Sequence, residues 1–465
     1  MKRWTALGLA VLLVLPAAAR ADTTTMLQDV VKKAAGALAV VRYEIDLETG
    51  KRVAMGQGIC ITQDGVFLTT SLDPRLPVKS LKGFQLILPG LKGKEVKAKL
   101  LGIDPWTGLG FVKATEPHTW QVVQFSSASN VSLGQPVASI GIMMGDPARP
   151  VYLGTAHVSA KLRVPGELVY VTGGRLTGTC SPVFTTGGQA IGIVGRQLSL
   201  GYQAQLLGLT RNRKAIPVGL RMQSSQETAF FTPVEEFVHV LRTPPSDGSV
   251  ARLPWMGVNK FEAVNKELAD ALKLDKPAVK VEDVIPNQPA AKGGLANNDI
   301  IVGFNGKPIE EMATPELSVR NFVRSLMRMN AGDQVKLKLF SGKEVTVTLG
   351  DMPKRPSEAK RYYNRAIGLL VREKVMLDQY LDKGETANVP GLIVLGMARG
   401  SAAAAAGLQG GDVITNVSNQ PVKTCDVFQQ IVEKSLATSQ TAPINFLVRR
   451  GEQAQVITVK PAGGS

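Results

Sequence analysis

The fold of this chain is most visible in Val171-Thr-Gly-Gly-Arg-Leu-Thr-Gly-Thr-Cys-Ser-Pro-Val-Phe-Thr-Thr-Gly-Gly-Gln-Ala-Ile-Gly-Ile-Val194. A loop rich in Gly and Thr ends here at Pro182, and two short apolar runs follow, separated by a Gly-Gly turn. Short β-branched runs bounded by Gly and Pro are typical of strands. The stretch therefore predicts a tight loop that runs into a buried strand.

The same punctuated pattern extends from residue 37 to about residue 220. Short apolar runs alternate there with Gly, Pro, Asn and Asp, as in Gly58-Ile-Cys-Ile-Thr62, Gly65-Val-Phe-Leu-Thr69, Gln85-Leu-Ile-Leu88 and Pro136-Val-Ala-Ser-Ile140. Many short strands with few helical periods predict an all-β barrel or sandwich. Helical spacing is expected only before it, at 22–33, and after it, at 234–241.

The chain of 465 residues begins with features of an export signal. Lys2 and Arg3 precede an apolar run over 6–15, and Ala19-Arg20-Ala21 has the A-x-A form of a cleavage site. The apolar run is too short to span a membrane, which needs about 20 residues. We expect a mature protein that starts near Asp22 in the periplasm or cell envelope. With only Cys60, Cys180 and Cys425, no disulfide framework is expected.

The formal net charge is +16, and loss of Lys2, Arg3 and Arg20 with the signal peptide would lower it to +13. Such a charge can attract polyanions. The basic residues are scattered, however, without a long run or interleaved aromatic residues. We therefore expect no nucleic-acid partner, no stable membrane span, no cofactor and no metal.

An internal repeat occupies the second half of the chain. Gln288-Pro-Ala-Ala-Lys-Gly-Gly-Leu295, Asn298-Asp-Ile-Ile301 and Asn305-Gly-Lys-Pro-Ile309 recur 113 residues later as Ser401-Ala-Ala-Ala-Ala-Ala-Gly-Leu408, Gly411-Asp-Val-Ile414 and Ser418-Asn-Gln-Pro-Val422. Each copy is a domain of about 100 residues, which is too large for a solenoid unit. Gly294 and Gly407 suit the position after a helix that requires positive φ.

The repeat resembles PDZ domains of the bacterial type. That resemblance implies a loop whose amides receive a peptide carboxylate, followed by a strand edge that pairs with the peptide. The corresponding loops are Trp255-Met256-Gly257-Val258 and Ala366-Ile367-Gly368-Leu369. The alternative is that both are ordinary strand starts in domains that have lost their ligand.

The first domain resembles the HtrA/Deg family of periplasmic serine proteases over about 210 residues. Gly56-Gln-Gly-Ile-Cys-Ile61, Gly65-Val-Phe-Leu-Thr-Thr70 and Asp104-Pro-Trp-Thr-Gly-Leu-Gly-Phe-Val-Lys113 match its G-S-G-F-I, G-x-x-L-T-N and D-P-x-T-D-L-A-x-x-K segments. The domain order matches as well. The resemblance implies a mainly β fold, with a chymotrypsin-like double β-barrel followed by two α+β PDZ domains.

The catalytic triad of that family is replaced at all three matching positions. Leu72 stands for the histidine, Gly108 for the aspartate and Thr179 for the serine. Leu72 can take no proton and Gly108 supplies no charge, so neither can activate a hydroxyl. Thr177 replaces a glycine of the oxyanion loop, and a β-branched residue fits poorly if φ is positive there.

Cys180 and Ser181 remain as alternative nucleophiles. With one deletion, Gly178-Thr-Cys180 mimics the loop of chymotrypsin-fold cysteine proteases, but a thiol still needs a base nearby. None of His118, His157 and His239 lies in the segment that supplies the base. We favour an inert cysteine that packs in the core.

These observations predict an exported HtrA-like pseudoprotease that binds peptides or unfolded protein C-termini, in a chaperone-like, scaffold or regulatory role. The alternative is an active endopeptidase of protein quality control, serine-type or Cys180-dependent. The expected domains are the signal peptide 1–21, the trypsin-like domain 22–241, a linker 242–254, PDZ domain 255–350, a linker 351–362 and PDZ domain 363–461. A homo-oligomer is implied by the resemblance alone.

Overall fold

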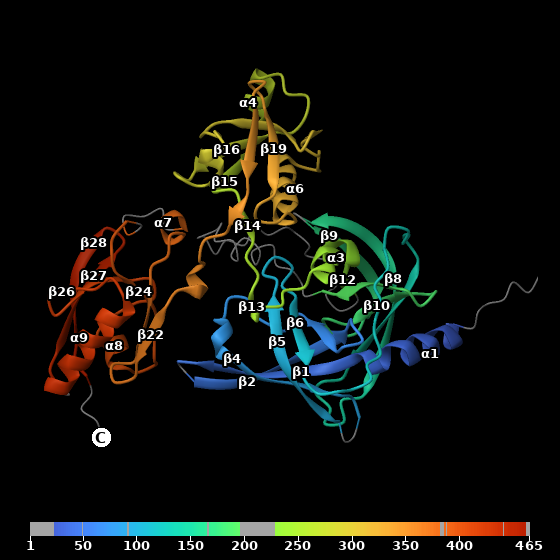
Figure 1. Cartoon of the computed structure of the whole chain (residues 1–465), viewed down its shortest axis with the longest axis horizontal. Coiled ribbons are helices and arrows are strands. Elements are labelled where there is room, and N and C mark those ends of the chain that lie inside the picture. Colours follow the sequence, from blue (N-terminus) through green and yellow to red (C-terminus); the bar gives the residue numbers. More distant parts are fainter. Residues whose placement is uncertain are drawn as a thin grey trace, which may run out of the picture.

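The computed structural model describes residues 23–48, 50–90, 93–164, 167–195, 228–381, 386, 388–439 and 441–461. The predicted signal peptide, 1–21, lies outside these residues. Within them the chain forms two closed β-barrels followed by two smaller units, each built on one sheet (Figure 1).

The first barrel has six strands in the order β5-β4-β1-β2-β3-β6, and it closes because β6 also pairs with β5. The strands are β1 (Leu38–Leu47), β2 (Gly50–Cys60), β3 (Val66–Thr69), β4 (Leu81–Ile87), β5 (Glu95–Ile103) and β6 (Gly110–Ala114), with β13 (Ser249–Val250) added in parallel beside β5. Helix α1 (Thr23–Ala34) and the 3-10 turn η1 (Ala35–Ala37) lead into β1, and η2 (Val78–Ser80) leads into β4.

The second barrel closes in the order β10-β11-β12-β9-β8-β7. Its strands are β7 (Pro136–Ile142), β8 (Val151–Val164), β9 (Glu167–Gly174), β10 (Pro182–Thr185), β11 (Ala190–Val194) and β12 (Thr228–Pro233). Both runs after the Gly- and Thr-rich loop are fully buried strands, as their continuous apolar character predicts. η3 (Val234–Glu236) and α3 (Val238–Arg242) follow β12, where a helix was expected.

A shared apolar core joins the two barrels. One buried cluster contains Leu38, Phe67 and Leu72 of the first barrel together with Ile140 and Cys180 of the second. Burial of apolar area is the main favourable term in folding. The loop that carries Cys180 is therefore anchored in the interior that both barrels use.

The first PDZ-like unit contains a sheet of order β15-β16-β17-β19-β20, with β18 paired to β17. Its elements are β14 (Pro254–Trp255), β15 (Val258–Ala263), α4 (Lys266–Ala271), β16 (Val279–Val284), α5 (Pro289–Lys292), β17 (Ile300–Phe304), β18 (Lys307–Pro308), α6 (Pro315–Met327), β19 (Gln334–Leu339), β20 (Glu344–Thr348) and β21 (Gly350–Asp351). β14 pairs with β21 in a small separate sheet. α6 begins with Pro315 in its first turn, and the Thr314 hydroxyl accepts a hydrogen bond from the Leu317 amide at 3.4 Å.

The second PDZ-like unit repeats this plan with one more strand, in the order β22-β23-β24-β25-β27-β28, with β26 paired to β25. Its elements are η4 (Pro356–Glu358), β22 (Arg361–Asn364), β23 (Leu369–Glu373), α7 (Asp378–Leu381), β24 (Leu392–Met397), α8 (Ala402–Ala405), β25 (Val413–Val417), β26 (Gln420–Pro421), α9 (Cys425–Thr438), β27 (Ile444–Arg450) and β28 (Gln453–Val459). Gly294 and Gly407 follow α5 and α8 with φ of 84° and 87°, as predicted.

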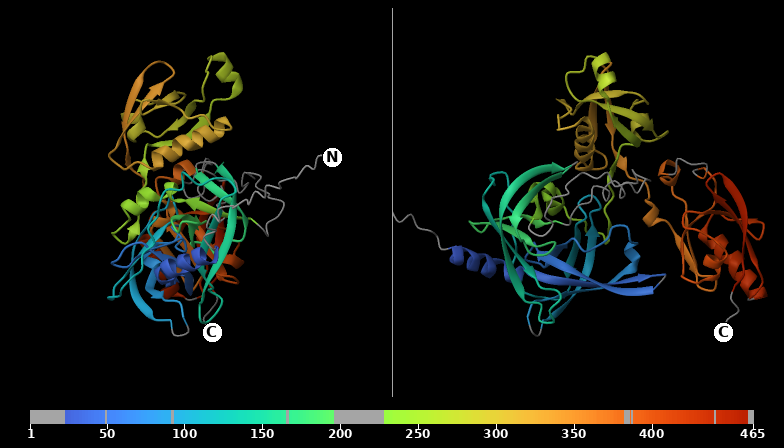
Figure 2. Two further views of the ribbon diagram at one scale, coloured as in Figure 1. Left: turned by 90° about the vertical axis from the view of Figure 1, so that its right-hand side faces the viewer. Right: turned by 180° about the vertical axis from the view of Figure 1, so that it is seen from behind.

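The double barrel with PDZ-like units confirms the fold predicted from sequence. Figure 2 shows the first PDZ-like unit above the barrels and the second beside them. In the part of the chain described, no helix has both the length and the apolar character needed to cross a bilayer. The exact domain boundaries stay a prediction; β22 begins at Arg361, inside the segment expected to be a linker.

Candidate functional site

Leu72 lies just after β3, at the edge of a cleft between the barrels. β3 pairs with β6 so that Thr69 faces Gly110, which places the residues after β3 beside those before β6. The Leu72 side chain is 1% exposed. A Cβ added to Gly110 would lie 2.4 Å from Leu72 Cδ1, so the leucine uses the space that this glycine leaves.

Gly108 lies in the turn between β5 and β6, with φ of 71°. The turn is organised by Asp104, whose carboxylate accepts hydrogen bonds from the Thr107 amide at 2.7 Å and the Thr107 hydroxyl at 2.5 Å. Burial raises the pKa of Asp104 above its usual range, although these hydrogen bonds oppose the shift. The carboxylate that remains in this segment is therefore used to hold the turn.

Thr179 is exposed in a cleft of about 550 Å³. The cleft is formed by both barrels, and its lining residues are Met55, Gly56, Gln57, Thr70, Ser71, Ile142, Met143, Met144, Tyr152, Gly178 and Thr179. Thr70 and Ser71 immediately precede Leu72, and Leu72 packs on Gly110 in the strand that follows the Gly108 turn. Of the three predicted positions, Thr179 lines this cleft, whereas Leu72 is buried directly after Ser71 and Gly108 lies in the turn before β6.

All three histidines belong to the described part of the chain, and no hydrogen bond joins any of them to Thr179, Cys180 or Ser181. His118 packs edge-on against Trp120 with ring centroids 4.3 Å apart. His157 lies in β8 opposite Pro136. His239 lies in α3, where burial lowers its pKa and the nearby charge of Asp104 acts in the opposite direction. None is placed to take a proton from the loop.

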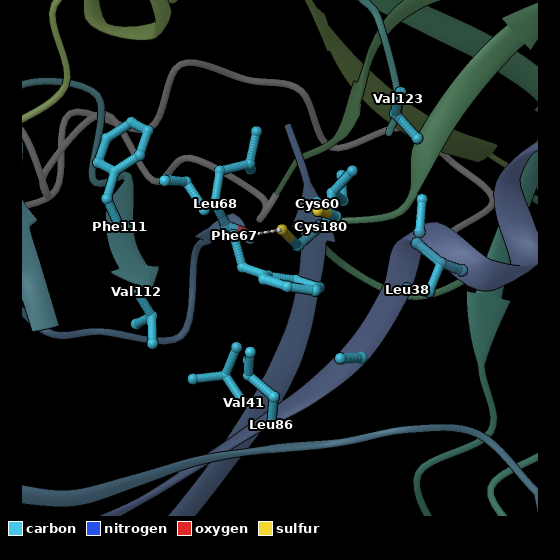
Figure 3. Close-up of a cluster of buried hydrophobic side chains, with 14 of the residues drawn as sticks. Leu38, Val41, Cys60, Phe67, Leu68, Leu86, Phe111, Val112, Val123 and Cys180 are labelled. Atoms are coloured by element: carbon cyan, nitrogen blue, oxygen red, sulfur yellow. Dashed lines mark hydrogen bonds between the residues drawn. The ribbon is translucent and has the colours of Figure 1, made fainter. Parts of the chain in front are cut away.

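Cys180 and Ser181 both point away from the cleft. Cys180 is 1% exposed, and its thiol donates to the Leu68 carbonyl at 3.9 Å (Figure 3). The same view places it beside Cys60, a buried thiol whose pKa burial raises to about 12. Ser181 is 0% exposed, and its hydroxyl accepts a hydrogen bond from Gln57 Nε2 at 3.0 Å.

The amide of Thr177, at an oxyanion position, is turned into the second barrel. It donates to the Ser139 hydroxyl at 2.8 Å, and the Thr177 hydroxyl bonds the same oxygen at 2.9 Å. Thr177 does not have positive φ, so the predicted misfit of a β-branched residue does not arise; among the loop residues 177–181 the left-handed backbone belongs to Cys180, with φ of 66°. An amide already bonded inside the barrel cannot stabilise an anion in the cleft.

The loop before β15 is the first of the two loops predicted to receive a peptide carboxylate. Gly257 has φ of 84°, and an added Cβ would meet Gln288 Cβ at 2.3 Å. The carbonyls of Met256 and Gly257 accept from Ala290 and Ile285 at 2.7 and 2.9 Å. Within the described residues the Met256 amide donates to no other group, and no strand pairs with the second edge of β15.

The loop before β23 has the same shape and different surroundings. Gly368 has φ of 65°, and the carbonyls of Ile367 and Gly368 accept from Ala403 and Ala398 at 3.0 and 2.8 Å. The second edge of β23 is paired with β22, and the Ile367 amide donates to Asn364 Oδ1 at 3.1 Å. The two predicted peptide loops are thus equivalent in backbone and differ in what lies against them.

Known families match the parts of the chain that hold the cleft and the loop before β15. Residues 56–193 match the family description "Trypsin-like peptidase domain", and 256–349 match "PDZ domain". Over 420 residues the chain is 28% identical to a "Probable periplasmic serine endoprotease DegP-like" of Pseudomonas savastanoi, covering 88% of this chain and 78% of that one. A protein of the same name from Pseudomonas putida is 27% identical, with 88% and 79% covered. This chain is thus similar to DegP-like endoproteases over most of its length.

Solved HtrA structures share this fold. "HtrA-type protease AlgW with tripeptide" superposes with a TM-score of 0.52 at 18% identity, covering 71% of this chain and 98% of that one. "HtrA-type protease AlgW with decapeptide" gives a TM-score of 0.51 at 18% identity, with 71% and 99% covered. The double barrel followed by a PDZ-like unit is a fold that this chain shares with these structures.

The barrels of this chain are bound to its first PDZ-like unit by a buried ionic contact. Glu236 in η3 accepts from Arg324 in α6 at 2.5 and 2.7 Å and from Arg328 at 3.0 Å. The Glu236 side chain is only 6% exposed. A small apolar cluster forms a second contact. In it, Trp106 of the turn that contains Gly108 packs with Leu253 and Met352, which flank the first PDZ-like unit.

Sequence reasoning missed two polar residues that hold the loop of residues 177–181 in place. Gln57 is buried and joins the barrels: its amide donates to the Cys180 carbonyl at 3.1 Å, and its oxygen accepts from the Ile142 amide at 2.8 Å. Ser139 receives the Thr177 amide. The available signal was that each polar residue lies in a short run of apolar and glycine residues, because a buried polar group must find a partner. In the described part of the chain, no group of three or more His, Cys, Asp or Glu residues could hold a metal ion.

Proposed function

We propose that this chain is an exported HtrA-type protein that binds C-terminal segments of peptides or unfolded proteins without cleaving them, in a chaperone-like, scaffold or regulatory role in the cell envelope. One observation supports this most strongly. The residues that match the triad positions, Leu72, Gly108 and Thr179, include no base, while β15 has an unpaired edge that follows a loop with positive φ at Gly257.

The side chain of Leu72 and the amide of Thr177 both disfavour cleavage. A hydroxyl is a weak nucleophile until a neighbouring base takes its proton, and an aliphatic side chain cannot do so. Leu72 is buried against Gly110, so no solvent-borne base has room at that place. The Thr177 amide donates inward to Ser139, which removes a donor for developing negative charge.

The β15 edge supports peptide binding. It comprises Val258–Ala263 and the loop before this strand. An extended peptide can add to an unpaired strand edge through main-chain hydrogen bonds. Helix α6 lies beside β15, where Phe322 packs edge-on against Phe261 with ring centroids 5.3 Å apart. A peptide on this edge would place its terminal carboxylate at the amides of Met256 and Gly257.

Equilibrium binding of a labelled decapeptide with an apolar free C-terminus tests the proposal. The full mature chain should bind the acid about 5- to 10-fold more tightly than the same peptide with a C-terminal amide, because charge-assisted hydrogen bonds are roughly twice as strong as neutral ones. An unrelated decapeptide of equal charge with a polar terminus serves as control. Equal affinity for acid and amide would argue against capture of a carboxylate.

An active endopeptidase is the second candidate, and the names of the relatives favour it, since the DegP-like proteins are called endoproteases. A serine-type activity would require Thr179 or Ser181 to gain a base, and a Cys180-dependent one would require the buried thiol to turn outward. Either would need a rearranged loop. The periplasmic location in the names of the relatives extends to this chain only as part of the proposal.

A further inference from the structure

The second PDZ-like unit carries an additional strand on the edge where the first has none. β22 pairs antiparallel with β23, with Arg361 opposite Arg372 and Asn364 opposite Leu369. The chain direction brings the C-terminal end of β22 to the loop formed by 366–369. A C-terminal peptide added to β23 would lie in this direction and end at this loop.

The other side of β22 contacts helix α9. The Tyr362 hydroxyl donates to Glu433 Oε1 at 3.0 Å, and its ring packs edge-on against Phe428 with centroids 6.1 Å apart. Lys360, just before the strand, donates to Asp426 Oδ1 at 2.6 Å. β22 therefore lies between β23 and α9, held on one side by backbone pairing and on the other by side chains.

Asn364 occupies the place of a terminal carboxylate. Its side chain is 5% exposed, and Oδ1 accepts from the Ile367 amide at 3.1 Å. Its Nδ2 donates to the Tyr362 hydroxyl at 3.2 Å, which fixes the amide group in this orientation. A carboxamide oxygen offers the loop the same acceptor as a carboxylate, without the charge.

We propose that the chain's own segment Arg361–Asn364 is the ligand of the second PDZ-like unit, with Asn364 as a neutral substitute for a peptide carboxylate. This inference uses the proposed function only in treating the loops before β15 and β23 as peptide sites. A tethered segment has an effective concentration of about the millimolar range, so a free peptide must displace it. The first PDZ-like unit stays available, because β14 pairs with β21 and leaves β15 uncovered.

The self-bound strand is also connected to the barrels. Arg361 Nε donates to Glu48 Oε1 at 2.9 Å, at the end of β1, and the two side chains are 14% and 25% exposed. A peptide that displaced β22 would separate this ion pair. Binding at the second unit is therefore linked to the contact between that unit and the first barrel.

Stoichiometry of peptide binding tests the inference on the full mature chain. The probe is the free-acid decapeptide described above, titrated by calorimetry. The variant Tyr362→Ala/Asn364→Ala removes the contacts of β22 with Glu433 and with the Ile367 amide. It should bind one more peptide per chain than wild type. Tyr363→Ala is the matched control, because it alters the same strand but leaves both contacts, and it should bind as wild type does.

Hydrogen exchange on the wild type gives a readout that does not depend on the folding of a variant. Because β23 is paired on both sides, the amides of 367 and 369–373 should be protected without peptide, whereas in 258–263 the alternate amides that face the open edge of β15 should exchange rapidly. Rapid exchange of the β23 segment, or the same number of sites in wild type and the double variant, would overturn the inference. If wild type binds no peptide and the double variant binds one, the self-bound strand is supported while the first unit's proposed function fails.

Discussion

The cleft between the barrels and the β15 edge of the first PDZ-like unit differ in the groups that the proposed function requires of them. In the cleft, the residues that match the predicted triad positions are an aliphatic side chain, a glycine and a threonine. The β15 edge needs no reactive side chain, because its binding groups are backbone amides. Backbone function persists as long as the fold does, whereas catalysis is lost with single side chains.

The largest expected effect comes from attempts to restore catalysis. Leu72→His/Gly108→Asp/Thr179→Ser should cleave casein only weakly, because the Thr177 amide still donates to Ser139. Adding Ser139→Ala frees that amide and should raise the rate by roughly 10²–10³-fold, the usual contribution of one oxyanion donor. Initial rates on labelled casein measure the difference. High activity in the triple variant alone would mean that the loop rearranges without help.

A smaller effect is expected when the shape of the β15 loop is changed. Gly257→Val should weaken binding of the free-acid decapeptide by about 10-fold or more, because its φ of 84° strains a β-branched residue and its Cβ would meet Gln288. Fluorescence anisotropy on the full chain measures the change. Gly332→Val is the control, since Gly332 has φ of 92° with open space around it. An equal loss in both variants would trace the effect to general strain.

The smallest effect concerns Asp104, in the turn between β5 and β6. Because burial raises the pKa of Asp104 in the folded state, the native state favours the protonated carboxyl. Its stabilising contribution is complete below the ordinary pKa and is lost as pH rises through the folded value. Asp104→Asn keeps an acceptor for Thr107 without this loss. Its melting temperature relative to wild type should therefore rise with pH, by a few degrees, roughly the shift that 1 kcal/mol produces.

Melting curves from pH 4 to 8 check this prediction, with Asp247→Asn as a comparison at an exposed turn. The pKa of Asp247 is lowered by hydrogen bonds from Ser249, so its substitution should give the opposite trend. A difference in melting temperature between Asp104→Asn and wild type that did not change with pH would contradict the interpretation that burial raises the pKa of Asp104.

Features set by local sequence were predictable. Short apolar runs gave the strands, and glycines after short helices marked Gly294 and Gly407 as positions of positive φ. These inferences succeed because strand pattern and turn chemistry act over a few residues.

Features set by contacts between distant segments were missed. Ser139 takes the Thr177 amide across 38 residues, and Arg324 reaches Glu236 across 88. The sequence equally gave no sign that β22 would pair with β23 while β14 pairs with β21. Which edge a short strand joins depends on the tertiary surroundings more than on its own residues.

Incubation of the purified mature chain with unfolded casein tests directly whether the chain lacks peptidase activity. We expect casein to stay intact on a gel, under conditions in which the Pseudomonas putida relative, as a positive control, degrades it. Fragments that appear with this chain, and disappear with Thr179→Ala, Cys180→Ala or Ser181→Ala, would contradict it and identify the surviving nucleophile.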